Sequence, residues 1–463
     1  MSFTGKRILI IGIARSGLAA AVALNRRGAV VGAYDAKERA LIRTGAEQLE
    51  RLNISMYAGE LPPLAKQDWD LIVVSPGVPM DTEIVKMAKS VAIPIIGEME
   101  LAFQLKSPAV EVYAITGTNG KTTTTALLHF ILEQDGRVSA VGGNIGTALC
   151  SLVDDLPSGE LVVEVSSFQL ETVDTFKPHV AGILNLTPDH LDRHKSMAEY
   201  ARIKGMVFRR QDSSDYLILN YEDEMVRSFS QTAESRIVFF SAERALTEGF
   251  FVEDNKVFLA GNGTRQLIAS LEGVGLRGKH NLENILCAVA MAWSAGVRED
   301  SISRALNRFT GVRHRLEQVA SHRGVLYIND SKGTNPDSTI KALEAFSEPI
   351  VLIAGGRAKG GDYSGVARLM ASRIKALVLL GEAKGMLKTA VMEQGFRNIY
   401  EVDDLVAAVE RASQLAVPGD VVLLSPACAS WDMFASYEHR GDLFCQEVAR
   451  LIEGETGHDS KGG

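Results

Sequence analysis

The sequence predicts an α/β protein with three domains, each built on a mostly parallel sheet. Short apolar runs of strand length alternate with amphipathic segments of helix length along nearly the whole chain, which is typical of parallel sheets covered by helices. The chain has 463 residues, more than one hydrophobic core usually holds, since cores rarely grow past about 250–300 residues. Polar, glycine-containing loops follow several of the expected strands, and these loops carry the candidate functional residues.

The first predicted domain, residues 1–98, is expected to hold a ligand that carries a nucleotide. Its first strand, 7–11, runs into the turn Gly12-Ile13-Ala14-Arg15-Ser16-Gly17 and a helix from residue 18, and Asp35 closes the next strand. Such a turn, with an acid about 20 residues on, resembles a dinucleotide-binding unit, so we expect a Rossmann-like domain. Ala14 replaces the middle glycine of that pattern, and a purely structural unit is the alternative.

The second predicted domain, residues 99–312, carries the strongest local signal. Thr116-Gly117-Thr118-Asn119-Gly120-Lys121-Thr122 lies between an expected strand, 110–115, and an expected helix, 122–134. Glycines let backbone N–H groups converge on phosphate oxygens, a lysine adds positive charge, and a threonine hydroxyl can bind Mg²⁺. We predict a nucleotide phosphate loop, hence a central P-loop mononucleotide-binding α/β domain. Ile115 stands where the usual pattern has its first glycine, and a glycine-rich turn without a ligand is the alternative.

Three more side chains of this domain are candidates. Glu164 ends one expected strand and His190 follows another, and carboxyl ends of parallel strands meet at one sheet edge, so both are expected near Lys121 in a divalent-metal site. A carboxylate paired with an arginine and a surface histidine are the alternatives. Lys204 lies in a helix expected at 196–209, with a capping box at Ser196. Taken alone, it is an ordinary helix lysine with its ammonium group in solvent.

The third predicted domain, residues 313–463, has polar loops after strands at 330–335, 355–359 and 425–430. The side chains of Lys332, Lys359, Thr334 and Ser430 are expected to form an anion-binding rim suited to a small dicarboxylate. Loop charges that are separately solvated are the alternative.

Composition excludes several classes of protein. Hydrophobic residues make up 46% and charged residues 23% of the chain, and the net charge of −8 argues against binding to nucleic acid or acidic lipid by bulk charge. No apolar run reaches the roughly 18–20 residues of a membrane span, and no signal-peptide pattern is present. The four cysteines form no Cys-x-x-Cys pair. We expect a monomeric cytoplasmic protein with small-molecule substrates, no nucleic acid partner and no disulfide framework.

Together these motifs resemble those of Mur ligases, the ATP-dependent enzymes that form the amide bonds of the peptidoglycan peptide. The resemblance spans essentially the whole chain. Its carriers are the segments 117–122, 142–146, 164–170, 189–194 and 278–281, with Asn284, and His314-Arg315. The segments 329–335 and 425–430 and the short first domain resemble the family member that adds D-glutamate to UDP-N-acetylmuramoyl-L-alanine. The resemblance implies that the third domain is Rossmann-like too.

The resemblance implies a site for each substrate. The implied ATP contacts are Gly117, Thr118, Asn119, Gly120, Lys121, Thr122, Asn284, Arg315 and Asp330. The residues implied to face the UDP-substrate are Arg15, Ser16, Asp35, Ser75 and Asn144. The implied amino-acid pocket consists of Lys332, Thr334, Lys359, Ser430 and Tyr437. The implied catalytic residues are Lys121, Glu164, His190 and Lys204.

Two Mg²⁺ sites are also implied, one near Thr122 and Glu164 and one near His190 and Lys204. In such ligases the lysine at the position of Lys204 is typically carbamylated, which turns a cation into a carboxylate able to bind metal. The implied reaction phosphorylates the substrate carboxylate with ATP and then joins it to the D-glutamate amine, through an acyl phosphate and a tetrahedral intermediate.

Three other functions stay open at this point. The chain could be a Mur-type ligase with a different amino acid. It could be a nicotinamide-dependent oxidoreductase, which Asp35 and the turn before the first helix favour but which leaves Lys121 unexplained. It could also be an ATP-gated binding protein without catalysis. For the ligase, we expect domain closure with hinges near 97–100 and 310–313.

Overall fold

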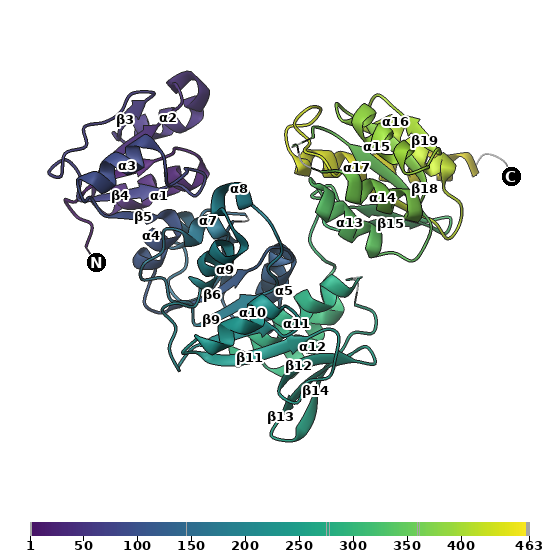
Figure 1. Cartoon of the computed structure of the whole chain (residues 1–463), viewed down its shortest axis with the longest axis horizontal. Helices are drawn as coiled ribbons and strands as arrows, with labels where there is room; N and C mark the ends of the chain where they lie inside the picture. The colour runs from purple at the N-terminus through teal and green to yellow at the C-terminus, as the bar shows by residue number, and fades with distance from the viewer. Residues whose placement is uncertain are drawn as a thin grey trace. The chain divides into compact units, whose positions relative to one another are not determined.

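The computed structural model describes residues 2–144, 146–274, 276, 278–358, 360 and 362–459, except the side chains of 192 and 454–459. Its strands form three sheets, of five, nine and six strands (Figure 1). The chain divides into two compact units, Met1–Gly273 with Leu282–Phe309, and Val274–Asn281 with Thr310–Gly463. The first two sheets belong to the first unit. The predicted α/β class is confirmed, and the predicted boundaries after residues 98 and 312 stay predictions.

The first sheet is parallel throughout, in the order β3-β2-β1-β4-β5. Its strands are β1 (Arg7–Ile11), β2 (Val30–Asp35), β3 (Ser55–Ala58), β4 (Leu71–Val74) and β5 (Ile95–Gly97), with helices α1 (Arg15–Arg26), η1 (Arg39–Ile42), α2 (Arg43–Arg51) and α3 (Glu83–Ser90). The winding direction reverses between β1 and β4, which is where such sheets bind ligands. This confirms the predicted Rossmann-like domain. Helix α1 begins at Arg15, before the expected residue 18, because Gly17 has no side chain and its first turn can pack directly on the Gly12 carbonyl.

The second sheet has the order β14-β13-β12-β11-β10-β9-β6-β8-β7, parallel from β7 to β12 and antiparallel from β12 to β14. Its strands are β6 (Val110–Thr116), β7 (Ser139–Gly143), β8 (Gly159–Glu164), β9 (Val180–Ile183), β10 (Tyr216–Asn220), β11 (Arg236–Ser241), β12 (Gly249–Glu253), β13 (Lys256–Gly261) and β14 (Thr264–Ser270). The helices are α4 (Glu98–Leu105), α5 (Lys121–Gln134), α6 (Leu149–Leu152), α7 (Ser167–Leu170), α8 (Leu191–His194), α9 (Met197–Gly205), α10 (Glu224–Ser228), η2 (Phe229–Gln231), α11 (Lys279–Ser294) and α12 (Glu299–Arg308).

Helix α9 is shorter than predicted. It ends at Gly205, where the sequence predicts residue 209. The Ser196 hydroxyl accepts the Glu199 N–H, as predicted for a capping box, while the Glu199 carboxylate pairs with Arg202.

The third sheet, in the second unit, has the order β15-β16-β20-β17-β18-β19 and is parallel except for β15. Its strands are β15 (Glu317–His322), β16 (Val325–Asn329), β17 (Ile350–Gly355), β18 (Ile374–Leu380), β19 (Ile399–Glu401) and β20 (Val421–Leu424). The helices are α13 (Pro336–Glu344), α14 (Ser364–Arg373), α15 (Lys384–Glu393), α16 (Leu405–Leu415) and α17 (Tyr437–Asp459). Separate apolar clusters cover the two faces of this sheet, one with α13 to α15 and one with α16 and α17. The central strands are therefore buried on both faces, as in a doubly wound fold.

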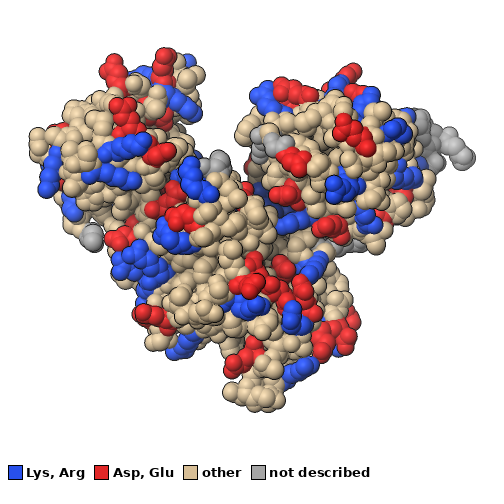
Figure 2. Space-filling view, in the orientation of Figure 1, with Lys and Arg blue, Asp and Glu red and all other residues tan. Residues whose placement is uncertain are grey.

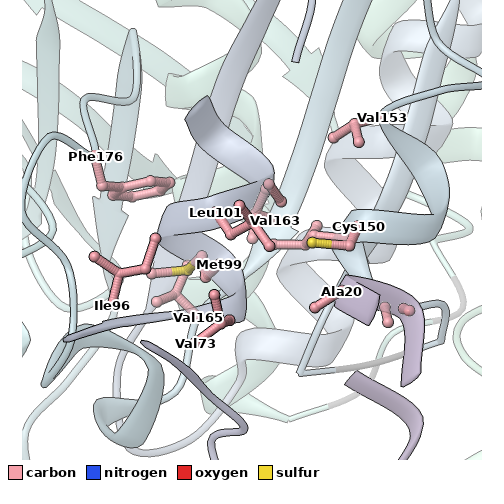
Figure 3. Close-up of a cluster of buried hydrophobic side chains, with 14 of the residues drawn as sticks. Ala20, Val73, Ile96, Met99, Leu101, Cys150, Val153, Val163, Val165 and Phe176 are labelled. Carbon is pink, nitrogen blue, oxygen red and sulfur yellow. The ribbon is translucent and has the colours of Figure 1, made fainter. Parts of the chain in front are cut away.

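One apolar cluster joins the first two sheets. Ala20 of α1 and Val73 of β4 belong to the same cluster as Met99 of α4, Cys150 of α6 and Val163 of β8 (Figure 3). Helix α1 packs against both α4 and α6. The first two sheets thus share a continuous core, which weighs against the predicted hinge at 97–100.

The surface carries both signs of charge. Figure 2 shows Lys and Arg side chains interspersed with Asp and Glu over the visible face. Among the residues with described positions, no helix combines the length and the apolar character needed to cross a membrane. The four cysteines are free thiols.

Candidate active site

The predicted phosphate loop connects β6 to α5. Gly117 and Gly120 have φ values of 144° and 87°, which only glycine adopts readily. A Cβ on Gly120 would collide with Oδ1 of Asn284, so the predicted contact residue Asn284 lies directly against the loop. Lys121 is the first residue of α5, and its Nζ donates to the carbonyl oxygens of Gly117 and Thr118 at 2.9 and 2.7 Å. The strand, turn and helix predicted around Lys121 are therefore confirmed.

Asn185, which the sequence did not point to, fixes the front half of this loop. Its Oδ1 accepts the Asn119 N–H at 2.8 Å, its Nδ2 donates to the Asn119 carbonyl at 3.2 Å, and its own carbonyl accepts the Thr118 N–H. The Thr118 hydroxyl lies 3.2 Å from the Tyr200 hydroxyl. Asn185 follows β9, the strand beside β6, and that adjacency was the signal that could have identified it.

Lys204 is buried under the same loop. Lys204 is only 1% exposed. Its Nζ donates to the Thr116 hydroxyl at 3.0 Å and to the Gly117 carbonyl at 2.9 Å. The two lysines, Lys121 and Lys204, therefore share the Gly117 carbonyl. The pKa of Lys204 lies well below its usual value, chiefly because burial disfavours the charged form and further because the Lys121 ammonium repels it, while Asp189 and Glu164 act in the opposite direction. The alternative of a solvated helix lysine is wrong.

Glu164 closes β8 and is 2% exposed. Its Oε1 accepts Nδ2 of Asn144 at 2.8 Å, and its Oε2 is buried without a hydrogen-bond partner. A buried carboxylate oxygen left unpaired is costly unless a ligand meets it, and carboxylate oxygen is a preferred ligand of Mg²⁺. Within the part of the chain that is described, no three His, Cys, Asp or Glu side chains are grouped to hold a metal by themselves. A cation at Glu164 would thus need hydroxyl, modified-lysine or phosphate oxygens as further ligands.

His190 lies in the loop between β9 and α8. Its side chain is 49% exposed, its ring centroid is 4.8 Å from that of Phe168, and its Nε2 is 3.5 Å from Asp189 Oδ2. The charge of Asp189 acts on Lys204, so this loop borders the Lys204 side of the site. His190 remains a candidate ligand on that side.

All five residues predicted to face the UDP-substrate line one cavity of about 940 Å³. They are Arg15, Ser16, Asp35, Ser75 and Asn144. The cavity lies at the carboxyl ends of β1, β2 and β4, the position expected for this sheet order. The Ser75 hydroxyl donates to the Gly12 carbonyl at 2.8 Å, and the Asp35 carboxylate accepts the N–H groups of Ile13 and Lys37 at 2.9 and 3.0 Å. These bonds fix the turn before α1.

Two predicted nucleotide contacts, Arg315 and Asp330, belong to the second unit. The charge of Arg315 acts on Asp330, which accepts the Ser425 hydroxyl at 2.7 Å. Burial raises the pKa of Asp330 to about 7. This carboxyl group is therefore poised between its charged and neutral forms near neutral pH.

The predicted amino-acid pocket falls on the loops after β16 and β20 and on the start of α17. The Lys332 ammonium lies 5.4 Å from the centre of the Tyr437 ring, and Ser430 is 2% exposed. Thr334 is half-buried in the same loop as Lys332. Lys359 lies outside the described residues. The structure thus brings Lys332 and Tyr437 together and leaves the position of Lys359 a prediction.

Arg440 on α17 was missed by the sequence. It is 1% exposed and donates to Oγ and the carbonyl of Ser331, at 3.0 and 2.8 Å, and to the Cys428 carbonyl. One guanidinium therefore joins the loop after β16 to the loop after β20. Nothing in the local pattern of a helix marks such a residue.

Family models match three consecutive parts of the chain. A Mur ligase MurD-like N-terminal domain matches residues 6–97, a Mur ligase middle domain matches 115–292, and a Mur ligase glutamate ligase domain matches 314–428.

Relatives match over nearly the full length. A UDP-N-acetylmuramoylalanine–D-glutamate ligase of Pelotomaculum thermopropionicum is 47% identical over 98% of this chain and 99% of its own, and one of Thermoanaerobacter pseudethanolicus is 41% identical over 97% and 100%. Among solved structures, the UDP-N-acetylmuramate-alanine ligase of Thermotoga maritima gives a TM-score of 0.59 at 21% identity, covering 96% of this chain and 100% of its own. MurF from Acinetobacter baumannii gives 0.58 at 19% identity, over 83% and 85%. At these identities the two structures show the fold alone.

Proposed function

The chain belongs to the Mur ligase family, and from this premise we propose that it joins D-glutamate to UDP-N-acetylmuramoyl-L-alanine, with ATP converted to ADP and phosphate. The observation that carries the proposal is the meeting of two lysines, Lys121 and Lys204, on the Gly117 carbonyl of the loop between β6 and α5. A nicotinamide oxidoreductase would leave both lysines without a role. The names of the full-length relatives support D-glutamate over another amino acid.

A carboxylate does not condense with an amine unaided, because its oxygen is a poor leaving group. In the proposed reaction the L-alanine carboxylate attacks the γ-phosphorus of ATP, the bond to the bridging oxygen breaks, and ADP leaves. The D-glutamate nitrogen then attacks the acyl carbon, and the tetrahedral intermediate loses phosphate while the nitrogen loses a proton. The first step brings two anions together, so the charge of Lys121 is most useful there.

Different groups of residues would bind the three substrates. The Thr118 and Asn119 N–H groups are held by Asn185, so the N–H groups at the start of α5 are those aimed at phosphate. Residues 15, 16, 35, 75 and 144 would orient the UDP part in its cavity. The loops with Lys332, Ser430 and Tyr437 would bind the amino-acid carboxylates.

The residues proposed to hold Mg²⁺ are Thr122, Glu164, His190 and carbamylated Lys204, in two sites. The unpaired Oε2 of Glu164 supports a cation there. When bound, Mg²⁺ would supply charge neutralisation at the phosphate oxygens.

Carbamylation of Lys204 is part of the proposal. The lowered pKa of Lys204 supports a neutral amine, whose nitrogen lone pair attacks CO₂. A nitrogen–carbon bond forms and one proton is released, leaving a negative carbamate. Lys204→Ala should abolish turnover and recover in part with short carboxylic acids, and ¹³C NMR after equilibration with ¹³C-bicarbonate should show a carbamate signal in the wild type alone. Full activity of the variant would remove Lys204 from the mechanism.

The test of the proposed function is mass-spectrometric detection of the amide product. The protein is incubated with ATP, Mg²⁺, UDP-N-acetylmuramoyl-L-alanine and a panel of D- and L-amino acids, and we expect product with D-glutamate only. Lys121→Ala should give no product, while Lys86→Ala, an exposed lysine on α3, should match the wild type. Product with a different amino acid, or ATP hydrolysis without any amide, would contradict the proposal.

A further inference from the structure

Two glutamates in the first turn of α4 are buried at the junction of the first two sheets. Glu98 is 1% and Glu100 0% exposed. Neither acid touches the lysines of the nucleotide loop in any described bond, and each accepts bonds from a different loop of the second sheet. Buried carboxylates need such partners, because burial disfavours their charge.

Glu98 holds the start of α6. Its Oε1 accepts the Cys150 N–H at 2.7 Å, and the Cys150 thiol donates to the Glu98 carbonyl oxygen at 3.5 Å. Two residues before α6 begins, the Thr147 carbonyl oxygen accepts the Gly143 N–H at 3.2 Å. Asn144 follows Gly143 and is itself bonded by Glu164, whose carbonyl oxygen accepts the Asn144 N–H at 2.9 Å, so Glu98 reaches Asn144 only through α6, Thr147 and Gly143.

Arg15, at the start of α1, is the second residue near Glu98, because it lines one small cavity together with Cys150, which Glu98 bonds. The positive charge of Arg15 acts on the Glu98 carboxylate. Arg15 and Asn144 both line the UDP cavity, one from each sheet. Glu98 is therefore connected to α6 by a hydrogen bond and attracted by the charge of Arg15.

We propose that Glu98 is a positioning residue for the nucleotide-diphosphate ligand: through α6 it keeps Asn144 in register with Arg15 so that both residues contact one ligand. The inference rests on the proposed function for the identity of the ligand. It assigns a ligand-binding consequence to a side chain that does not line the cavity.

Glu100 provides the matched control. It stands in the same turn, is equally buried, and accepts the N–H groups of Asp174, Thr175 and Phe176 and the Thr175 hydroxyl. It braces the loop after α7, away from α6. If Glu98 were simply a structural anchor, the two acids should respond alike.

The experiment measures binding of UDP and of ATP by calorimetry to the full chain and to Glu98→Gln and Glu100→Gln. Glutamine keeps the shape but loses the charge. We expect Glu98→Gln to weaken UDP binding about tenfold and to leave ATP binding within twofold, because the acceptor of the Cys150 N–H becomes neutral and the attraction to Arg15 is lost. Glu100→Gln should lower the melting temperature and leave both affinities within twofold.

Hydrogen exchange supplies a second readout if glutamine impairs folding. In the wild type, UDP should slow deuterium uptake in the peptide that contains residues 144–150. In Glu98→Asp, which keeps the charge but shortens the reach, that slowing should be lost. Equal UDP affinity in Glu98→Gln and the wild type, or equal weakening of UDP and ATP, would overturn the inference. UDP binding by a wild type that makes no amide would instead overturn the proposed function and leave this inference in place.

Discussion

The loop before α1 and the loop before α5 occupy the same place in their sheets and differ in chemistry. Each follows a buried parallel strand and opens a helix, with positive φ at Gly12 in one and at Gly117 and Gly120 in the other. The first loop is fixed by neutral bonds and by Asp35, whose carboxylate is taken up by backbone N–H groups. The second has two lysines on one carbonyl and borders an unpaired carboxylate oxygen. The two loops thus share a backbone geometry and differ in their buried charges, and in the proposed function these charges supply the reactivity.

The largest difference in kinetic effect should appear between Lys121→Ala and Arg15→Ala. Removing the ammonium should lower kcat by roughly 10³-fold, about 4 kcal/mol, because it stabilises charge at the transferring phosphoryl group. Arg15→Ala should raise KM for the UDP-substrate about tenfold with kcat nearly unchanged. Steady-state phosphate release measures both. A comparable loss of kcat in the two variants would erase the distinction between the loops.

The next difference should appear between substitutions of the two acids, Glu164 and Asp35. Glu164→Gln should lower kcat by roughly 10²-fold and raise the Mg²⁺ concentration needed for half-maximal rate, because the unpaired oxygen becomes an amide. Asp35→Asn keeps one oxygen acceptor for two N–H donors, so it should weaken UDP binding about tenfold. The dependence of the rate on Mg²⁺ concentration should not change. The readouts are a Mg²⁺ titration of phosphate release and UDP calorimetry. An altered Mg²⁺ dependence in Asp35→Asn would speak against this assignment.

The glycines should distinguish stability from binding. A Cβ on Gly17 would collide with the Gly12 carbonyl and approach the Ser75 hydroxyl, so Gly17→Ala should cost about 2–3 kcal/mol of unfolding free energy. Gly120→Ala puts a side chain at φ 87° and against Asn284, so ATP affinity should fall with a smaller stability loss of about 1–2 kcal/mol. Urea unfolding and ATP calorimetry test this pair. Unchanged ATP binding in Gly120→Ala would argue against phosphate contact there.

The last difference is a pH dependence of stability at Glu98. Burial raises the pKa of Glu98 from 4.5 to about 6, so its favourable contribution is complete below pH 4.5 and is lost as pH rises through 6. The shift corresponds to about 2 kcal/mol. Relative to the wild type, Glu98→Gln should therefore gain about 2 kcal/mol of unfolding free energy between pH 4.5 and pH 7, measured by urea unfolding. Parallel stability curves would show that the Glu98 charge costs nothing when buried.

The sequence predicted the fold class because strand-length apolar runs and loop residues are local signals. The turn before α1 and the loop before α5 both lie where short-range patterns put them. Boundaries that depend on packing were less accurate. The start of α1, expected at residue 18, is at Arg15, and the end of α9, expected at residue 209, is at Gly205. A glycine that allows close approach starts α1 early.

Burial and long-range pairing were beyond the sequence. A solvated lysine was the plain interpretation of Lys204, because nothing in helix α9 reveals that Thr116 and Gly117 lie above it. Asn185 and Glu98 were missed for the same reason, since their partners are far along the chain. The family resemblance supplied a role for Lys204, and the structure supplies the physical environment in which that role is tested.

Ala20 and Val73 pack into one cluster with Cys150 and Val153. The residues matched by the N-terminal family model therefore do not have a hydrophobic core of their own. A chimera that takes only residues 6–97 from a relative replaces one side of this packed interface and keeps the other. The differing side chains would then meet inside the buried core. Crossovers should be tolerated better after Phe309, where the chain passes from one compact unit to the other. Packing thus constrains recombination near residue 97, although the family models place a domain boundary there.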